Sequence, residues 1–169
     1  RDYDDWASDI THVLLPGVGS YKHGMCSLER MSLVHRLTDY AQEGGNLLGI
    51  CLGMQLLADA GFEGGFRTGG LGLIGGSVRP VDQLITPKVG WGFCVRRSGN
   101  LRLLPEEPSC RQAFYLMHSY RLVPRTDKES NIGFAEYSNA GDVPIIVEAG
   151  NVFGVQFHPE KSGPAGIEL

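Results

Sequence analysis

A cysteine between two glycines is the residue of this sequence best placed to do chemistry. Cys51 stands in Gly49-Ile50-Cys51-Leu52-Gly53, directly after a short apolar run and directly before an apolar helical pattern. This order predicts a strand, a sharp turn and a helix, the arrangement in which G-x-S-x-G sequences expose a nucleophile. Glycine has no Cβ, so the two glycines leave room for the bend. This elbow places Cys51 to attack a carbonyl, but a lone cysteine in an α/β core is more often structural, and the flanking glycines alone do not decide between the two roles.

The predicted helix gives Cys51 a favourable electrostatic setting. The first turn of a helix has unpaired N–H groups and the positive end of the helix dipole, and both favour a thiolate over a thiol. The amide of Leu52 would point at the oxygen of a tetrahedral adduct on Cys51. We therefore expect Leu52 to supply one donor of an oxyanion hole.

A histidine and a carboxylate follow an apolar strand near the other end of the chain. His158 and Glu160 come after the strand expected at 152–157, so both leave the same edge of a sheet, and Pro159 prevents the strand from continuing. His-Pro-Glu alone is more often a turn. Together with Cys51 it forms a complete set of nucleophile, base and orienting carboxylate, provided that the fold brings positions 51 and 158 together.

Composition limits the class of protein. The 169 residues are enough for one domain, 42% of them are hydrophobic and 20% charged, and no apolar run approaches the ~20 residues of a membrane span. Lysine and arginine number 15 against 19 acidic residues, for a net charge of −4, without a basic cluster. We expect a soluble protein that binds neither nucleic acid nor a membrane.

The cysteines and histidines give no sign of a metal site. Cys26, Cys51, Cys94 and Cys110 form no C-x-x-C pair, the five histidines are scattered, and the chain begins without a signal-peptide pattern. We therefore expect no metal and no cofactor, and a reduced, cytoplasmic setting.

Apolar runs alternate with helical stripes along the chain. This alternation predicts an α/β fold with a central mixed, mostly parallel sheet flanked by helices, and a ligand site at the carboxyl ends of the strands. Gly61 to Gly76 is expected to be a mobile surface connection, and Pro105 to Pro108 a loop. Pro16 to Gly19 is expected to be a tight loop, and the segment around Gly150 a hairpin. Strands are expected at 10–15, 47–50, 77–81, 89–97, 114–118, 132–137, 144–148 and 152–157, and helices from 25 to 44, from 52 to about 60, and from 163.

The G-x-C-x-G elbow and the H-P-E segment together resemble the class I (triad) glutamine amidotransferases, which have a flavodoxin-like class I glutaminase fold. Within that family the chain is most similar to the glutaminase subunits of imidazole glycerol phosphate synthase. The likeness covers nearly the whole chain. It is carried by segments that occur in the same order, namely 15–19, 49–57, 70–74, 90–91, 118–120 and 156–162.

The resemblance implies a role for each residue of the site. Cys51 would attack the side-chain amide of L-glutamine, His158 would take and then return the proton, and Glu160 would orient His158. The amide of Val18, turned inward, would complete the oxyanion hole with that of Leu52. Residues expected to bind glutamine are Gly17, Gly53, Gln55, His118, Ser119 and Tyr120, with backbone amides near Ser119 and Tyr120 holding the substrate carboxylate.

Ammonia released into bulk water at neutral pH becomes mostly ammonium, which is not a nucleophile, so a partner that receives the ammonia directly is implied. By resemblance the partner is a cyclase subunit, a (β/α)₈ barrel that makes imidazole glycerol phosphate and AICAR in histidine biosynthesis, in a heterodimer with Trp91 and Lys161 near the contact. The chain departs from the family at this surface. It has Pro87-Lys88-Val89-Gly90-Trp91-Gly92 where the family usually has Pro-His-x-Gly-Trp-Asn.

Two alternatives remain open at this point. One is a glutaminase subunit that feeds a sugar-amidating enzyme of surface polysaccharide synthesis, because such subunits share these motifs. The other is a non-catalytic glutamine-binding regulatory module. The resemblance also predicts that 1–169 is a single glutaminase domain without the family's first strand and helix, for which Arg1 to Asp9 is no substitute, and without the end of its last helix.

Overall fold

The computed structural model of the protein describes residues 10–81, 86–98, 101–104, 112–125, 131–136 and 143–169. The predicted loop at Pro105–Pro108, the segment Arg1–Asp9 and Cys110 lie outside these ranges.

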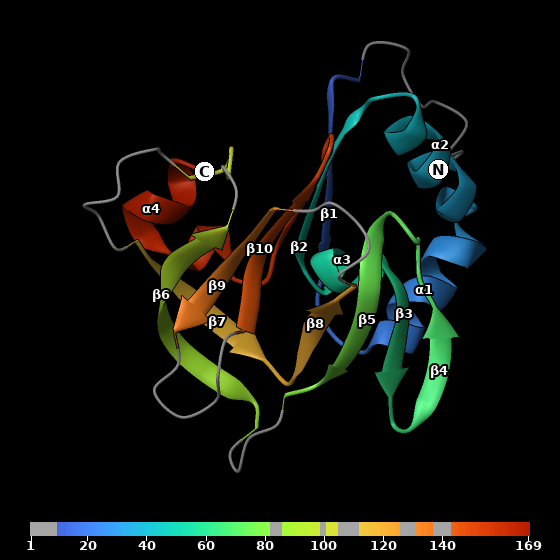
Figure 1. Ribbon diagram of the computed structural model, residues 1–169. Coiled ribbons are helices and arrows are strands. Elements are labelled where there is room, and N and C mark those ends of the chain that lie inside the picture. Colours follow the sequence, from blue (N-terminus) through green and yellow to red (C-terminus); the bar gives the residue numbers. More distant parts are fainter. Residues whose placement is uncertain (1–9, 82–85, 99–100, 105–111, 126–130, 137–142) are drawn as a thin grey trace.

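The larger sheet has seven strands in the order β1-β2-β11-β10-β9-β6-β7 (Figure 1). The first three, β1, β2 and β11, run parallel to one another, and every later neighbour is antiparallel. Their bounds are His12–Gly17 (β1), Asn46–Cys51 (β2), Val152–Val155 (β11), Val143–Ala149 (β10), Asn131–Glu136 (β9), Lys88–Ser98 (β6) and Ala113–His118 (β7).

The predicted strands and the mixed α/β class are confirmed, but the expectation of a mostly parallel sheet is corrected. Within the seven described strands of this sheet, only the pairings of β1 with β2 and of β2 with β11 are parallel. Parallel neighbours need a long crossover, whereas β10 and β11 are joined by the predicted hairpin at Gly150, whose φ is +61°. Helical crossovers in the described residues are confined to the first half of the chain, so antiparallel pairing dominates the second half.

A second sheet of four strands, in the order β4-β3-β5-β8, overturns two predictions. The helix expected from Leu52 to about Ala60 is α3, Leu52–Leu56, and the chain then enters β3 at once. The expected mobile connection at Gly61–Gly76 contains a β-hairpin instead. Its turn is Gly64-Gly65, with φ of +62° and +80°, as the two-residue turn of a tight hairpin requires. The strands are Ala58–Glu63 (β3), Phe66–Gly69 (β4), Ile74–Pro80 (β5) and Tyr120–Pro124 (β8).

The predicted long helix from Met25 to Gly44 is two helices. Ser32 has φ of +55°, a left-handed conformation that interrupts the helix between α1, Tyr21–Arg30, and α2, Leu33–Gln42. Ser20 begins α1 by accepting a hydrogen bond from the His23 amide. The short 3₁₀ helix η1, Pro159–Lys161, leads into α4, Gly163–Ile167, where a helix was predicted.

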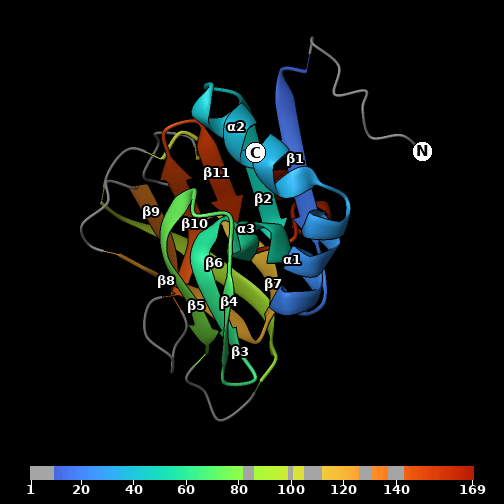
Figure 2. The same cartoon turned by 90° about the vertical axis from the view of Figure 1, so that its right-hand side faces the viewer.

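The two faces of the larger sheet carry two hydrophobic cores, because side chains alternate along each strand. Leu47 and Val147 face α1, α2, α3 and the smaller sheet, which lie together in Figures 1 and 2. Leu48 and Ile146 face the other side, toward α4 and the stacked rings of Phe114 and Phe157, whose centroids are 3.9 Å apart. No helix in the described part of the chain is long and apolar enough to cross a membrane.

Candidate active site

The three parallel strands end side by side and so bring the predicted site together. Gly17 at the end of β1 is paired with Cys51 at the end of β2, and Val155 at the end of β11 is paired with Ile50. Val18, Cys51 and the segment leading to His158 therefore leave the sheet at one edge. The condition on which the triad depended, that positions 51 and 158 meet, is fulfilled.

Cys51 lies on a strained turn between β2 and α3. Its φ is +55° and its ψ −109°, a conformation that costs a non-glycine residue of the order of 1–3 kcal/mol. The two glycines allow α3 to lie against the strands: a Cβ on Gly49 would come within 2.7 Å of the Gly53 backbone, and one on Gly53 within 1.7 Å of the Leu15 carbonyl oxygen. The predicted order of strand, sharp turn and helix around Cys51 is confirmed, and the role of Cys51 as a nucleophile stays a prediction.

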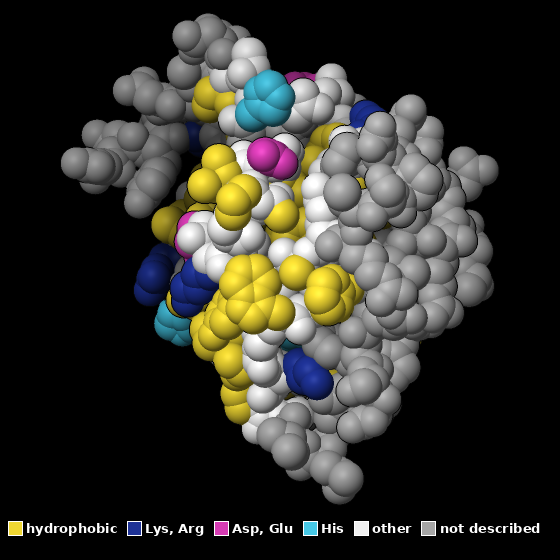
Figure 3. All heavy atoms as spheres, turned by 90° about the vertical axis from the view of Figure 1, so that its left-hand side faces the viewer, with side chains coloured by type: hydrophobic (Ala, Val, Ile, Leu, Met, Phe, Trp, Pro, Cys, Tyr) yellow, Lys and Arg dark blue, Asp and Glu magenta, His cyan; other side chains and the backbone are white. Residues whose placement is uncertain are grey.

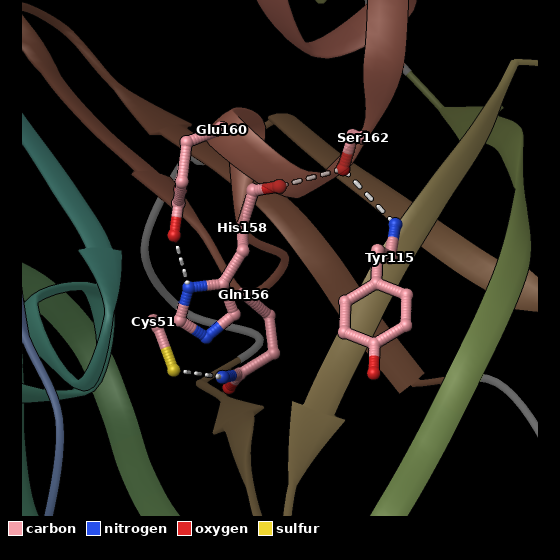
Figure 4. A network of polar contacts seen from close by, with 6 residues as sticks. All are labelled: Cys51, Tyr115, Gln156, His158, Glu160 and Ser162. Atoms are coloured by element: carbon pink, nitrogen blue, oxygen red, sulfur yellow. Dashed lines mark hydrogen bonds and ion pairs between the residues drawn. The ribbon is translucent and has the colours of Figure 1, made fainter.

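The histidine ring is oriented as a general base requires. Nδ1 of His158 donates to Oε1 of Glu160 at 2.9 Å, which leaves Nε2 as the proton acceptor. This Nε2 is buried and has no hydrogen-bond partner in the described part of the chain. Figure 4 shows the ring between the Glu160 carboxylate and the side chains of Cys51 and Gln156.

Glu160 remains a carboxylate. The largest single influence, its slight burial, raises its pKa. Hydrogen bonds from its own amide and from His158 lower the pKa, as do the charges of His158 and Lys161. Together these outweigh the burial, so the pKa of Glu160 lies below its ordinary value. A negative charge beside Nδ1 stabilises the imidazolium that forms when Nε2 takes a proton.

The environment of the cysteine corrects one prediction. Burial raises the pKa of the Cys51 thiol above its ordinary value, and the negative charge of Glu160 raises that pKa further. Hydrogen bonds from the Leu52 amide and from Gln156 lower the pKa, as does the charge of Lys161, but burial outweighs them. The helix begins where expected, but α3 has only five residues and the thiol is 8% exposed. Desolvation of the charged form therefore exceeds the effect of the helix N-terminus, and the thiol needs a base.

A cavity of about 240 Å³ opens over Cys51. Its size suits a ligand smaller than the drug-sized molecules that fill pockets of ~300–1,000 Å³. Eight predicted site residues line it: Val18, Cys51, Leu52, Gln55, His118, Ser119, Tyr120 and His158. Gly17 and Gly53 are not in the lining and lie where β1 packs against α3. A part for these two residues in binding glutamine stays a prediction.

His118 presents an unused acceptor at this cavity. Its Nδ1 donates to the Tyr120 carbonyl oxygen at 2.8 Å, and its Nε2 is buried without a partner among the described residues. Burial lowers the pKa of His118, the bond to Tyr120 partly offsets this, and the charge of Lys88 lowers it further. The ring is therefore neutral at pH 7, with a lone pair on Nε2.

Three further residues of the site have no assigned role in the sequence analysis. Gln156, in an apolar strand pattern, donates through Nε2 to the sulfur of Cys51 at 3.8 Å. Ser162 donates to the His158 carbonyl oxygen at 2.7 Å and accepts from the Tyr115 amide at 3.0 Å (Figure 4). A buried polar residue within an apolar run was the available signal for Gln156, and the position just after His-Pro-Glu-Lys was the signal for Ser162.

Glu63 is the third, and no motif marks it. It lines the cavity, and its Oε2 accepts a hydrogen bond of 2.6 Å from the amide of Tyr21, the first residue of α1. It lies at the end of β3, a strand where the sequence predicted a mobile connection.

The two predicted partner-facing residues lie together around Tyr115. Trp91 packs edge-on against the Tyr115 ring, with centroids 5.9 Å apart, and Nζ of Lys161 lies 6.0 Å from the centre of the same ring. Trp91 is 57% exposed and belongs to an apolar patch formed by Val89, Trp91, Phe93 and Met117, which share one face of β6 and β7. Figure 3 shows hydrophobic side chains gathered on this side of the molecule.

No group of three or more histidine, cysteine, aspartate or glutamate side chains that could hold a metal ion occurs in the described residues. The described residues of the site include a buried thiol, a histidine whose Nε2 has no partner among them, and a carboxylate bonded to its Nδ1.

Comparison with known proteins places this geometry in a family. Residues 3–168 match the family described as glutamine amidotransferase class-I. The chain is 42% identical over 161 residues to the imidazole glycerol phosphate synthase subunit HisH of Moorella thermoacetica, covering 93% of this chain and 72% of that protein. It is 41% identical over 170 residues to subunit HisH 1 of Prochlorococcus marinus, covering 94% and 77%. A crystal structure of a glutamine amidotransferase has a TM-score of 0.65 at 18% identity, over 93% of this chain and 75% of the other, which confirms the fold.

Proposed function

Because the chain belongs to the class I glutamine amidotransferases, we propose that it is the glutaminase of an imidazole glycerol phosphate synthase. It hydrolyses glutamine to glutamate and ammonia, and the ammonia is used by a synthase partner in histidine biosynthesis. The observation that carries the proposal is the strained Cys51 at the bottom of a small cavity beside the His158–Glu160 pair, in a chain 42% identical to a HisH subunit.

The reaction proceeds through a thioester. Nε2 of His158 takes the proton of the Cys51 thiol as the sulfur attacks the side-chain amide carbon of glutamine. The same proton goes to the leaving nitrogen, so ammonia departs and a γ-glutamyl thioester remains. A water molecule, deprotonated by His158, then attacks the thioester and releases glutamate and the thiol. The raised pKa of Cys51 makes the transfer to His158 necessary, because little thiolate is present beforehand.

Two amides at the same edge of the sheet are suited to the oxyanion. The Leu52 amide belongs to the first residue of α3, directly after Cys51, and it lowers the pKa of the Cys51 thiol. Val18 lies next to Gly17, the register partner of Cys51, and lines the cavity. We infer that these two amides hold the oxygen of the tetrahedral intermediate, a contribution of ~10²–10³ in turnover for each donor.

The polar groups around the cavity suit an amino acid. Glu63 provides a carboxylate for the substrate ammonium group, and Ser119 and Tyr120, which also line the cavity, are proposed to hold the substrate carboxylate with their backbone amides. The unshared nitrogen of His118 accepts a further hydrogen bond. The three features recognise the backbone end of glutamine and leave its side-chain amide for Cys51.

The apolar patch is proposed to receive the cyclase subunit. Met117 belongs to the patch and also lines the cavity. Pro87, just before β6, lines the cavity as well. The patch therefore continues into the mouth of the active site. A partner seated there covers this mouth and takes ammonia before water protonates it. Trp91, packed on Tyr115 with Lys161, is the anchor of the contact.

The hydrophobic core supports treating residues 1–169 as a single glutaminase domain, because one cluster joins strands of both sheets with α1, α2 and α3. Of the alternatives, the relatives favour the histidine-pathway synthase over a sugar-amidating enzyme. The assembled triad favours an enzyme over a non-catalytic binding module.

The test is to replace Cys51 by serine and assay the complex with the cyclase. Synthesis from glutamine should be lost and synthesis from added ammonia retained, because the hydroxyl lacks the nucleophilicity of the thiolate. Glutaminase turnover should also be measured alone, with the cyclase, and with the cyclase and its nucleotide substrate. An increase across the three conditions is expected if the Val18 amide turns inward when the partner is occupied. Loss of both activities in the Cys51 variant would refute the assignment.

A further inference from the structure

A buried glutamine contacts the sulfur of the proposed nucleophile. Gln156 is fully buried, and its Nε2 donates to the sulfur of Cys51 at 3.8 Å. Nε2 of His158 meanwhile has no partner in the described part of the chain. In this structure the side chain that hydrogen-bonds the sulfur is therefore an amide, whereas Nε2 of His158 accepts no hydrogen bond from the described residues (Figure 4).

The orientation of this amide is fixed by its neighbours. Oε1 of Gln156 accepts a hydrogen bond of 2.9 Å from Nε2 of Gln55, which also donates to the Tyr120 carbonyl oxygen at 3.1 Å. If the Gln156 amide were turned over, two NH₂ groups would face each other and an oxygen would face the sulfur. The donor of Gln156 is therefore held toward Cys51.

The same chain of bonds reaches the substrate cavity. Gln55 and Tyr120 line the cavity, and the Tyr120 carbonyl also accepts from His118, whereas Gln156 itself is not in the lining. A side chain that is shielded from the substrate and fully buried has no means of binding glutamine directly. Among the described residues its side chain hydrogen-bonds the sulfur of Cys51 and the amide of Gln55.

We propose that Gln156 is the donor that holds the Cys51 sulfur and stabilises its thiolate, and that Gln55 keeps it oriented for this task. The inference rests on Cys51 being the nucleophile of the proposed glutaminase. A hydrogen bond to a charged acceptor is stronger than one to a neutral acceptor, so the donor favours thiolate over thiol. It acts together with the Leu52 amide, against the burial that disfavours the charge.

The variant that tests this is Gln156→Glu. It keeps the size of the side chain and its oxygen toward Gln55, but a carboxylate cannot donate to the sulfur and adds a negative charge beside it. Gln42→Glu is the matched control, because Gln42 is exposed at the end of α2. Gln156→Met is a second variant, which removes the donor without adding charge.

The measurement is the rate at which iodoacetamide alkylates Cys51 between pH 6 and 10, followed by mass spectrometry. The groups that act on this sulfur are His158, Glu160 and Lys161, with His118 and Glu63 across the cavity. All of these are unchanged in the variants, and the exposed Cys26 on α1 provides an internal control. We expect the rate for Cys51 at pH 7 to fall about three- to tenfold in Gln156→Met, the worth of one hydrogen bond, and more in Gln156→Glu.

Glutaminase kinetics of the whole complex give the second readout. kcat should fall by a similar factor with little change in KM, because Gln156 does not line the cavity. An unchanged alkylation rate for Cys51 in a Gln156→Met variant that melts at the wild-type temperature would overturn the proposal. So would equal falls in rate at Cys51 and Cys26, because the change would then not be specific to the sulfur that Gln156 contacts. Alkylation is measured without glutamine, so the inference can fail while the glutaminase assignment stands, and the Cys51→Ser assay tests the latter separately.

Discussion

The closest backbone approach in the site predicts a graded series of glycine variants. A Cβ at Gly53 would lie 1.7 Å from the Leu15 carbonyl oxygen, whereas Cβ atoms essentially never come within 3.0 Å of such an atom. Alanine at this position therefore forces α3 and β1 apart by about 1.3 Å. At Gly49 the nearest atoms, in the Gly53 and Met54 backbone, are 2.7 Å away, so a separation of about 0.3 Å is enough.

The expected losses follow from these displacements. A misplacement of about 1 Å can cost ~10²-fold in rate, because the reacting atoms must align. Gly53→Ala moves the elbow that carries both Cys51 and the Leu52 amide, so we expect kcat to fall about 100-fold or more and stability by about 1–3 kcal/mol. Gly49→Ala should lose less on both measures.

The matched control is Gly69→Ala in β4. No atom lies within 4 Å of the position of its Cβ, and its φ is not positive, so the alanine meets neither a clash nor strain. It should leave kcat unchanged and keep or slightly raise the melting temperature, because alanine is favoured over glycine in a strand by about 0.5–1 kcal/mol.

The assay is glutaminase turnover with the cyclase present, together with thermal unfolding of each variant. If Gly53→Ala fails to fold, Gly49→Ala still carries the test, because its overlap is small enough to leave the fold intact. Wild-type kcat in a folded Gly53→Ala variant would refute the reasoning, since the elbow would then tolerate the displacement. A loss in Gly69→Ala equal to that in Gly49→Ala would do the same.

Three further predictions concern the thiol and the partner surface. Burial raises the pKa of Cys51, so its alkylation in the isolated protein should be slower at pH 7 than that of an unstructured cysteine peptide and should increase as the pH rises; equal rates at pH 7 would contradict this. A diazo-ketone analogue of glutamine should label Cys51 and spare Cys26, Cys94 and Cys110, and mass mapping to any other cysteine would exclude Cys51 as the nucleophile. Trp91→Ala should weaken cyclase binding by ~30-fold or more, as loss of an interface hot spot does, measured by calorimetry. Phe66→Ala, an exposed aromatic residue on β4, should leave that affinity unchanged.

The parts of the site that depend on a local sequence pattern could be predicted. The elbow could be read from Gly49, Cys51 and Gly53, because only a residue without a Cβ fits at either side of the turn. His158 and Glu160 followed from a strand that ends in a polar turn. The meeting of the two segments depends on β2 and β11 being neighbours, a long-range pairing that the residues alone do not specify.

The sequence predicts β5 of the smaller sheet, at 77–81, but not β3 and β4, because the local signals there indicate another structure. Glycines at 61, 64, 65, 69 and 70 indicate a flexible connection when read locally. In the fold, Gly61 leaves room for the ring of Tyr21 and Gly70 for its hydroxyl group, which a Cβ would meet at 2.6 Å and 2.2 Å. The role of Glu63 was hidden for the same reason. The pKa of Cys51 was also misjudged, because a helix N-terminus can be read from sequence but the burial of the thiol cannot.

Tyr115 joins the apolar patch to the catalytic base and so determines how partner variants must be interpreted. Its ring contacts Trp91 and Lys161, while its backbone accepts from the His158 amide at 3.0 Å and donates to Ser162, which in turn donates to the His158 carbonyl oxygen. A substitution at Trp91 therefore alters the packing on Tyr115, whose backbone holds His158, as well as the surface for the cyclase. Affinity and the turnover of the saturated complex must be measured separately, because a loss of affinity alone comes from the patch, whereas a loss of turnover at saturation comes from the position of the base.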